Sequence, residues 1–168
     1  MKKTDPMRRR SRSAALLLLA ACALAPGGAG AREEDRTSPG GMKYFLVVPA
    51  DYDAERGAPL LAGLHGAGSS RENFRDACLP SLPAYRDAIW VIPDAPGETW
   101  SIPQDSSEIM GICRALREEF SVRWRGVVGF SAGGWAANHL ASGFPEEWEA
   151  FVIAAAGLHE QIPLPREP

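Results

Sequence analysis

Residues 126–135 read GVVGFSAGGW, and this stretch decides the fold class. The apolar run at 126–130 has the composition of a buried strand, and it leads directly into Ser131. Residues 132–142, AGGWAANHLAS, are compatible with a helix that begins right after the serine. A buried strand followed at once by a helix is the repeating unit of parallel α/β sheets.

Other short apolar runs repeat this pattern along the chain. Further strands are predicted at residues 43–49, 60–65, 88–93 and 151–156. Apolar residues recur at helical spacing over 105–120, which predicts an amphipathic helix, and a shorter helix is predicted near 70–77. Strands that are apolar throughout and alternate with helices indicate an α/β fold, with a mostly parallel sheet and helices on both faces.

Length and charge indicate one domain behind a basic N-terminal segment. A chain of 168 residues that is 45% hydrophobic can build one core, but it is too short for two. The formal net charge is −3, yet basic residues outnumber acidic ones by five in residues 1–31, so the rest carries −8. A body this acidic argues against nucleic acid and anionic membrane surfaces as partners.

The N-terminal segment has the pattern of an export signal. Basic residues are followed by the apolar run AALLLLAACALA and then by small residues ending at Ala31, which predicts a signal peptide over residues 1–31. A second route stays open, because Leu19-Ala20-Ala21-Cys22 resembles the lipobox of bacterial lipoproteins and would place a lipid anchor on Cys22. The predicted location is therefore secreted or periplasmic, or membrane-anchored as a lipoprotein.

Downstream of this signal, residues 32–42 (REEDRTSPGGM) are charged and then rich in proline and glycine, which predicts a flexible leader. The folded domain is expected over residues 43–168. In an oxidising compartment Cys78 and Cys113 are free to form a disulfide, and two separate thiols are the alternative. The spacing of cysteines and histidines matches no metal site, so no metal or cofactor is predicted.

The pattern Gly129-Phe130-Ser131-Ala132-Gly133 is a G-x-S-x-G motif in its expected setting between a strand and a helix. A serine at the tip of such a turn adopts a strained backbone, and glycines two positions before and after it leave room for the turn. A nucleotide-binding turn is the alternative, but the spacing does not fit G-x-G-x-x-G and no P-loop lysine follows.

A second motif, LHGAG at residues 64–68, follows another predicted strand. Acyl transfer needs two backbone N–H groups aimed at the developing oxyanion. With Ser131 as the nucleophile, one N–H comes from the next residue, Ala132. The other comes from a glycine-rich loop such as this one.

Together LHGAG, VIPDAP (residues 91–96) and GFSAGG (residues 129–134) resemble α/β-hydrolase esterases over about residues 42–158. The nearest groups are the phospholipase/carboxylesterase and the polyhydroxybutyrate-depolymerase/feruloyl-esterase-like ones. This resemblance implies a serine hydrolase that acts on small-molecule or polymer esters, with Ser131 as nucleophile. It also implies Ala67 as the second oxyanion donor, His65 as a brace for the oxyanion loop with Gly66 and Gly68 in support, and no cofactor.

Two further expectations concern the rest of the site. Trp100 follows a predicted strand at the edge where ligands bind in open parallel sheets, so it is expected to line the substrate pocket or to pack in the core. In this fold the catalytic acid and histidine follow the serine along the chain. With 37 residues after Ser131, we expect the last two strands and both groups to be missing, and the chain to be weakly active or inactive.

Rival functions stay open at this point. A non-catalytic exported binding domain on a degenerate hydrolase fold would need neither motif, and a fragment of a prolyl-oligopeptidase-type peptidase would share the serine turn. The strand at 151–156 would form an exposed apolar sheet edge, which predicts self-association.

Overall fold

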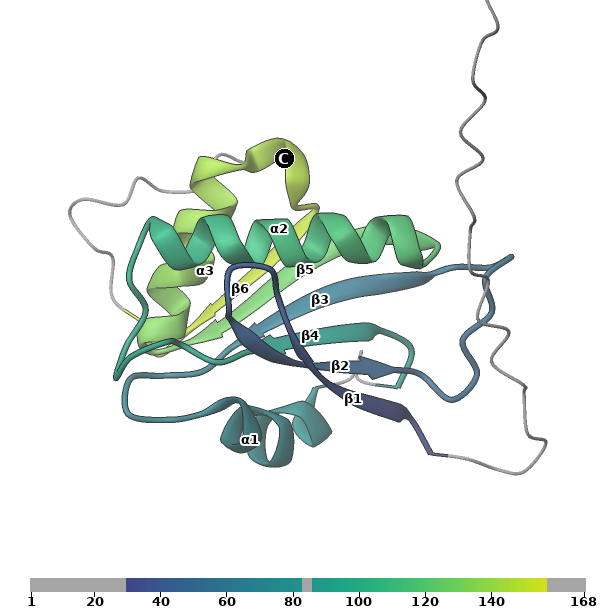
Figure 1. Cartoon of the computed structure of the whole chain (residues 1–168), viewed down its shortest axis with the longest axis horizontal. Helices are drawn as coiled ribbons and strands as arrows, with labels where there is room; N and C mark the ends of the chain where they lie inside the picture. The colour runs from purple at the N-terminus through teal and green to yellow at the C-terminus, as the bar shows by residue number, and fades with distance from the viewer. Residues whose placement is uncertain (1–29, 83–85, 157–168) are drawn as a thin grey trace, which may run out of the picture.

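The computed structural model describes residues 30–82 and 86–156, and its centre is a six-stranded sheet (Figure 1). The strands follow the order β1-β2-β4-β3-β5-β6 across the sheet. Their bounds are β1 (Arg32–Thr37), β2 (Lys43–Val48), β3 (Ala58–Leu64), β4 (Ile89–Pro93), β5 (Val122–Phe130) and β6 (Ala150–Ala154). Strands β4, β3, β5 and β6 are parallel, whereas β2 is antiparallel to both of its neighbours, β1 and β4, so the expected mostly parallel α/β sheet is confirmed.

Helices cover both faces of this sheet (Figure 1). On one face lie α2 (Gln104–Glu119) and α3 (Ala132–Gly143), and on the other lies α1 (Arg71–Asn73), continued by a π turn (Phe74–Cys78) and a 3-10 turn (Leu79–Ser81). A further 3-10 turn, Pro145–Glu147, precedes β6. None of the helices in the described part of the chain is long and apolar enough to cross a membrane.

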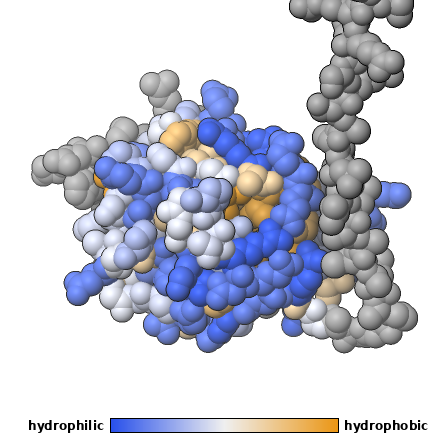
Figure 2. Space-filling model, in the orientation of Figure 1, coloured by the Kyte–Doolittle hydropathy of each residue, from blue (hydrophilic) through white to orange (hydrophobic). Residues whose placement is uncertain are grey.

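Two hydrophobic cores result, because alternate residues of a strand point to opposite faces of a sheet. In β4, Ile89 and Val91 pack beneath α2 and α3, whereas Trp90 and Ile92 pack against the α1 side. The outer surface over α2 and the β1–β2 hairpin is mostly hydrophilic, with local apolar patches (Figure 2).

The prediction of a flexible leader over residues 32–42 is wrong, because these residues form β1 and a turn into β2. Every residue of β1 pairs in register with β2, from Arg32 opposite Val48 to Thr37 opposite Lys43. The turn is closed by the Ser38 N–H, which donates to the Met42 carbonyl at 2.9 Å, and Gly41 supplies a φ of 93°. An edge strand of charged residues has no apolar alternation, so its sequence pattern is that of a loop.

Ion pairs to remote helices explain the charges on both faces of β1. Arg71 binds Asp35 through two nitrogens at 2.6 and 2.9 Å. From the opposite face of β1, Arg36 binds Glu119 through two nitrogens at 2.7 and 2.8 Å. The Arg71 guanidinium also lies 4.1 Å from the centre of the Phe45 ring. The charged strand is thus tied to α1 on one face and to the end of α2 on the other.

The two described cysteines lie on opposite faces of the sheet. Cys113 belongs to the core beneath α2 and α3, whereas Cys78 packs against the α1-side core, and both are free thiols. Because the sheet separates them, they do not form the disulfide that the sequence left open. Burial raises the pKa of the Cys113 thiol to about 12, so it stays protonated at neutral pH. Cys22 and the signal region lie outside the described residues.

Candidate active site

Ser131 lies at the carboxyl end of β5, on a strained turn into α3. Its φ of 53° and ψ of −119° fall where residues with a side chain are rarely found. Two backbone hydrogen bonds hold this conformation: the Ser131 N–H donates to the Ala154 carbonyl at 2.9 Å, and the Gly134 N–H donates to the Ser131 carbonyl at 2.8 Å. The turn is therefore fixed to β6 as well as to its own helix.

Close backbone contacts explain the glycines around this serine. A Cβ on Gly129 would lie 2.1 Å from the Gly133 carbonyl oxygen. A Cβ on Gly133 would lie 2.2 Å from the Leu64 carbonyl oxygen and 2.5 Å from that of His65. Backbone atoms cannot yield as a flexible side chain can, so both positions exclude any larger residue.

The loop after β3 lies against this turn. A Cβ built on Gly66 would be 3.3 Å from the Ser131 Cβ, which places the loop directly beside the serine. Within the loop His65 and Gly66 are buried, whereas Ala67 and Gly68 are exposed at the edge of the sheet. The two motifs, separated by more than sixty residues in sequence, thus meet at the carboxyl end of the parallel strands.

His65 is bonded through both ring nitrogens and has no free lone pair. Its Nδ1 lies 2.8 Å from the Gly66 carbonyl oxygen, which only accepts, so Nδ1 carries the proton. Its Nε2 accepts the Ala95 N–H at 3.1 Å. The Asp94 carboxylate, 3.3 Å from Nε2, accepts the Arg71 N–H at 3.2 Å. A ring bonded in this way cannot take a proton from Ser131.

Trp100 lies in the core and not in an open pocket. Its side chain packs with its ring centre 5.0 Å from that of His65, and only 7% of the residue is exposed. The indole Nε1 donates a hydrogen bond to the His65 carbonyl oxygen at 2.8 Å. Of the two alternatives derived from the sequence, the structure therefore shows the packed one.

Asp105, which the sequence did not single out, anchors the segment that carries Trp100. Its carboxylate accepts the Ser101 N–H at 2.6 Å, and its own N–H donates to the Ser101 carbonyl at 2.8 Å. The residue is buried, and this desolvation raises the pKa of its carboxyl above the ordinary value, partly offset by the Ser101 N–H. An Asp at the start of an amphipathic helix is common, so the sequence carried no signal for this role.

No general base contacts the serine within residues 30–82 and 86–156: the Ser131 hydroxyl has no hydrogen-bond partner there. His139 lies two turns further along α3, about 12 Å away at ~1.5 Å per residue. Burial lowers the pKa of its imidazole, and its Nδ1 is buried without a partner among the described residues. His159 and Glu160 lie outside the described residues.

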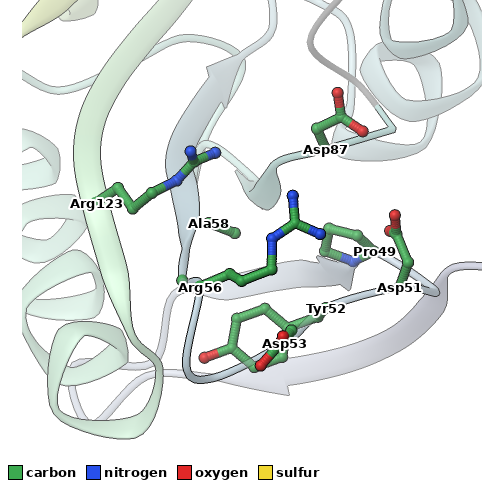
Figure 3. A pocket seen from close by; sticks show the side chains of 9 residues that line it. Pro49, Asp51, Tyr52, Asp53, Arg56, Ala58, Asp87 and Arg123 are labelled. Atoms are coloured by element: carbon green, nitrogen blue, oxygen red, sulfur yellow. The ribbon is translucent and has the colours of Figure 1, made fainter.

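A separate polar cleft of about 180 Å³ lies at the opposite end of the sheet. It is lined by the connection between β2 and β3, by the residues just before β4 and by the start of β5, among them Arg56, Asp87 and Arg123. Arg56 reaches into it, with Asp51 and Asp87 on one side and Arg123 on the other (Figure 3). Open parallel sheets bind ligands at the carboxyl ends of their strands, so we place the candidate site at Ser131 and not here. No group of three His, Cys, Asp or Glu side chains in the described ranges is placed to hold a metal ion.

A serine on a strained strand-to-helix turn, above a mostly parallel sheet covered by helices on both faces, defines the α/β-hydrolase fold. Comparison with solved structures supports this assignment of the fold. An acetyl xylan esterase from Aspergillus awamori superposes with a TM-score of 0.64 at 14% identity, over 81% of this chain and 57% of that one. A feruloyl esterase module from Clostridium thermocellum, solved with sinapinate, gives a TM-score of 0.60 at 18% identity, over 76% and 54%.

Among curated proteins, the chain is 28% identical over 128 residues to a protein from Aspergillus niger named "Probable feruloyl esterase C". The match covers 70% of this chain and 47% of that protein, so the chain spans about half the length of this relative. No protein-family model matches the sequence.

Proposed function

We propose that this chain carries the nucleophile half of a serine hydrolase that cleaves carboxylic esters through an acyl-enzyme on Ser131. The observation that carries this proposal is the strained serine turn lying beside the glycine-rich loop after β3. Strain of this kind persists only where the surrounding structure enforces it, and it exposes the hydroxyl at the edge of the sheet. The likeness to esterases in fold and sequence supports the same reaction class.

In this proposal the N–H groups of Ala67 and Ala132 stabilise the oxyanion. Ala132 is the first residue of α3, and the N–H groups of the first helical turn have no partner within their own helix. Neither N–H donates a hydrogen bond to any other described residue. Two backbone donors on either side of the serine are the arrangement that acyl transfer requires.

The base and the acid of the proposed enzyme are assigned to parts of the protein beyond the described residues. His65 is occupied by the backbone and His139 is remote, so neither is assigned as the base. A serine without its base reacts slowly, and an oxyanion hole with substrate binding leaves a residual acceleration of roughly 10³-fold over water. We therefore expect weak ester hydrolysis from this chain. The substrate class rests only on the names of similar proteins, which suggest feruloyl esters or acetylated xylan.

Covalent labelling tests this proposal without requiring turnover. The folded chain is incubated with a fluorophosphonate, and the modified peptide is identified by mass spectrometry. We expect slow labelling at Ser131 that disappears in Ser131→Ala and persists in Ser107→Ala, a matched change of an exposed serine on α2. Labelling distributed over other serines, or none at all, contradicts the proposal. Tight binding of ester-like ligands without any labelling would favour the rival reading, a binding domain on a degenerate hydrolase fold.

We also propose export through the N-terminal signal and self-association through β6. At this sheet edge Phe151 is 40% exposed and Val152 is 52% exposed. An apolar groove of about 200 Å³ lies beside them, lined in part by Trp90 and Trp124. A charge on such an edge blocks strand pairing. Size-exclusion chromatography with light scattering should show oligomers that Val152→Lys converts to monomers, and a wild-type monomer would contradict self-association.

A further inference from the structure

The oxyanion loop is held from outside by one segment, residues 95–100. The Trp100 indole donates to the His65 carbonyl at 2.8 Å, and the Gly68 N–H donates to the Glu98 carbonyl at the same distance. The Ala95 N–H donates to the His65 ring. These three hydrogen bonds hold the backbone of the loop at His65 and at Gly68, and they also hold the His65 ring.

These bonds determine where the Ala67 N–H points. A peptide group is planar and trans, so its N–H points opposite to its C=O. The Gly66 carbonyl shares a peptide with the Ala67 N–H, and it accepts from the His65 Nδ1 at 2.8 Å and from the Ser69 N–H at 3.2 Å. With that carbonyl directed to the buried His65 ring, the Ala67 N–H is directed away from the ring. The orientation of this donor therefore depends on the position of His65.

We propose that Trp100 is a positioning residue of the oxyanion hole: its indole N–H fixes the His65 carbonyl and thereby the direction of the Ala67 N–H. This inference rests on the proposed function of the loop. Trp100 is itself placed by the bonds between Ser101 and Asp105 at the start of α2. The path runs from α2 through Trp100 and His65 to the donor.

Two other buried tryptophans pack without a hydrogen bond from the indole, in contrast to Trp100. The indole nitrogens of Trp90 and Trp148 are buried without a hydrogen-bond partner among the described residues. Trp148 lies in the same core cluster as Trp100 and has the same 7% exposure. An indole N–H is therefore not needed for a tryptophan to pack in this core, and the bond made by Trp100 serves the loop.

The test compares Trp100→Phe with Trp148→Phe, two identical changes in one core, of which only the first removes a hydrogen bond. The first readout is fluorophosphonate labelling of Ser131 over a range of probe concentrations. A misdirected oxyanion donor should lower the maximal labelling rate roughly 10-fold to 100-fold in Trp100→Phe and leave the half-saturating concentration unchanged. In Trp148→Phe the rate should stay within about twofold of wild type.

The second readout is amide hydrogen exchange at Gly68 and Ser69, which does not depend on any chemistry at Ser131. Exchange should accelerate in Trp100→Phe and not in Trp148→Phe. If wild type is not labelled at all, the proposed function fails, and exchange alone then decides whether Trp100 fixes the loop. Equal exchange and equal labelling in the two variants overturn the inference.

A third variant shows whether the effects of Trp100→Phe come from a destabilised fold or from a misdirected Ala67 N–H. Replacing the Trp100 indole with benzothiophene keeps the shape of the ring and removes only the N–H. This protein should melt close to wild type and still show the slower labelling and the faster loop exchange. Wild-type behaviour in both readouts would assign the effects of Trp100→Phe to packing and overturn the proposal.

Discussion

The serine turn at residues 129–134 and the loop at residues 65–68 lie against each other, but different forces hold them. The turn is held by its own backbone, through hydrogen bonds to β6 and α3 and through contacts that only glycine permits. The start of the loop shares these contacts with Gly133, but its far end has none: a Cβ on Gly68 would meet nothing within 4 Å. Side chains and backbone from residues 95–100 hold the loop instead.

The two parts of the site therefore differ in how much of their structure a short stretch of sequence determines. The serine turn also contacts β6 and the end of β3, but the glycines it needs lie within five residues of one another, so a short motif is enough to recognise it. The loop depends on Trp100, more than thirty residues away, and on the start of α2 beyond it. Substitutions of the same kind should therefore have different effects in the two halves.

The largest effect is expected for Gly133→Ala. The added methyl group would lie 2.2 Å from the Leu64 carbonyl oxygen, so β3 and α3 must move apart. We expect the free energy of unfolding to fall by about 3 kcal/mol or more, as measured by urea denaturation. Gly111→Ala is the control, because this exposed position in α2 has nothing within 4 Å. It should gain roughly 0.5–1 kcal/mol, and a similar loss in both variants would contradict the argument from contacts.

A smaller effect is expected for Gly68→Ala. This position has open space but a φ of 66°, which a residue with a Cβ adopts only with strain. The loss should be about 1 kcal/mol, and faster amide exchange should be confined to residues 66–69. If exchange also rises at Gly134, the two halves of the site are not held independently, and the comparison between them fails.

The same division explains what the sequence could predict. The strands β2 to β6, the helix α2 and the serine turn follow from apolar runs, helical spacing and one five-residue motif, all of them local. The strand β1 was predicted as a loop because its order depends on partners such as Arg71 and Glu119, far away in the chain. The hydrogen bond from Trp100 to His65 could not be predicted for the same reason, since no spacing rule places an indole N–H against a particular carbonyl.

The smallest effect is expected at Asp105, which holds the segment that carries Trp100, and this effect depends on pH. Burial raises the pKa of Asp105 above its ordinary value of 3.8, so folding favours the protonated carboxyl. The stability it contributes is complete below pH 3.8 and is lost as the pH rises through the raised pKa of the folded state. Asp105→Asn keeps an oxygen for the Ser101 N–H without the charge. It should therefore be more stable than wild type at neutral pH, and this gain should vanish as the pH approaches 3.8.

Asp35→Asn is the control with the opposite sign. The hydrogen bond from Arg71 lowers the pKa of Asp35, so its contribution is present above pH 3.8 and is lost as the pH falls through the lowered pKa. Asp35→Asn should be slightly less stable than wild type at neutral pH and equal to it in acid. Thermal unfolding of wild type and both variants from pH 3 to pH 8 measures the two slopes. If Asp105→Asn instead loses stability at neutral pH, the ionised carboxylate is needed to hold Ser101, and the support of the loop at residues 65–68 is electrostatic as well as steric.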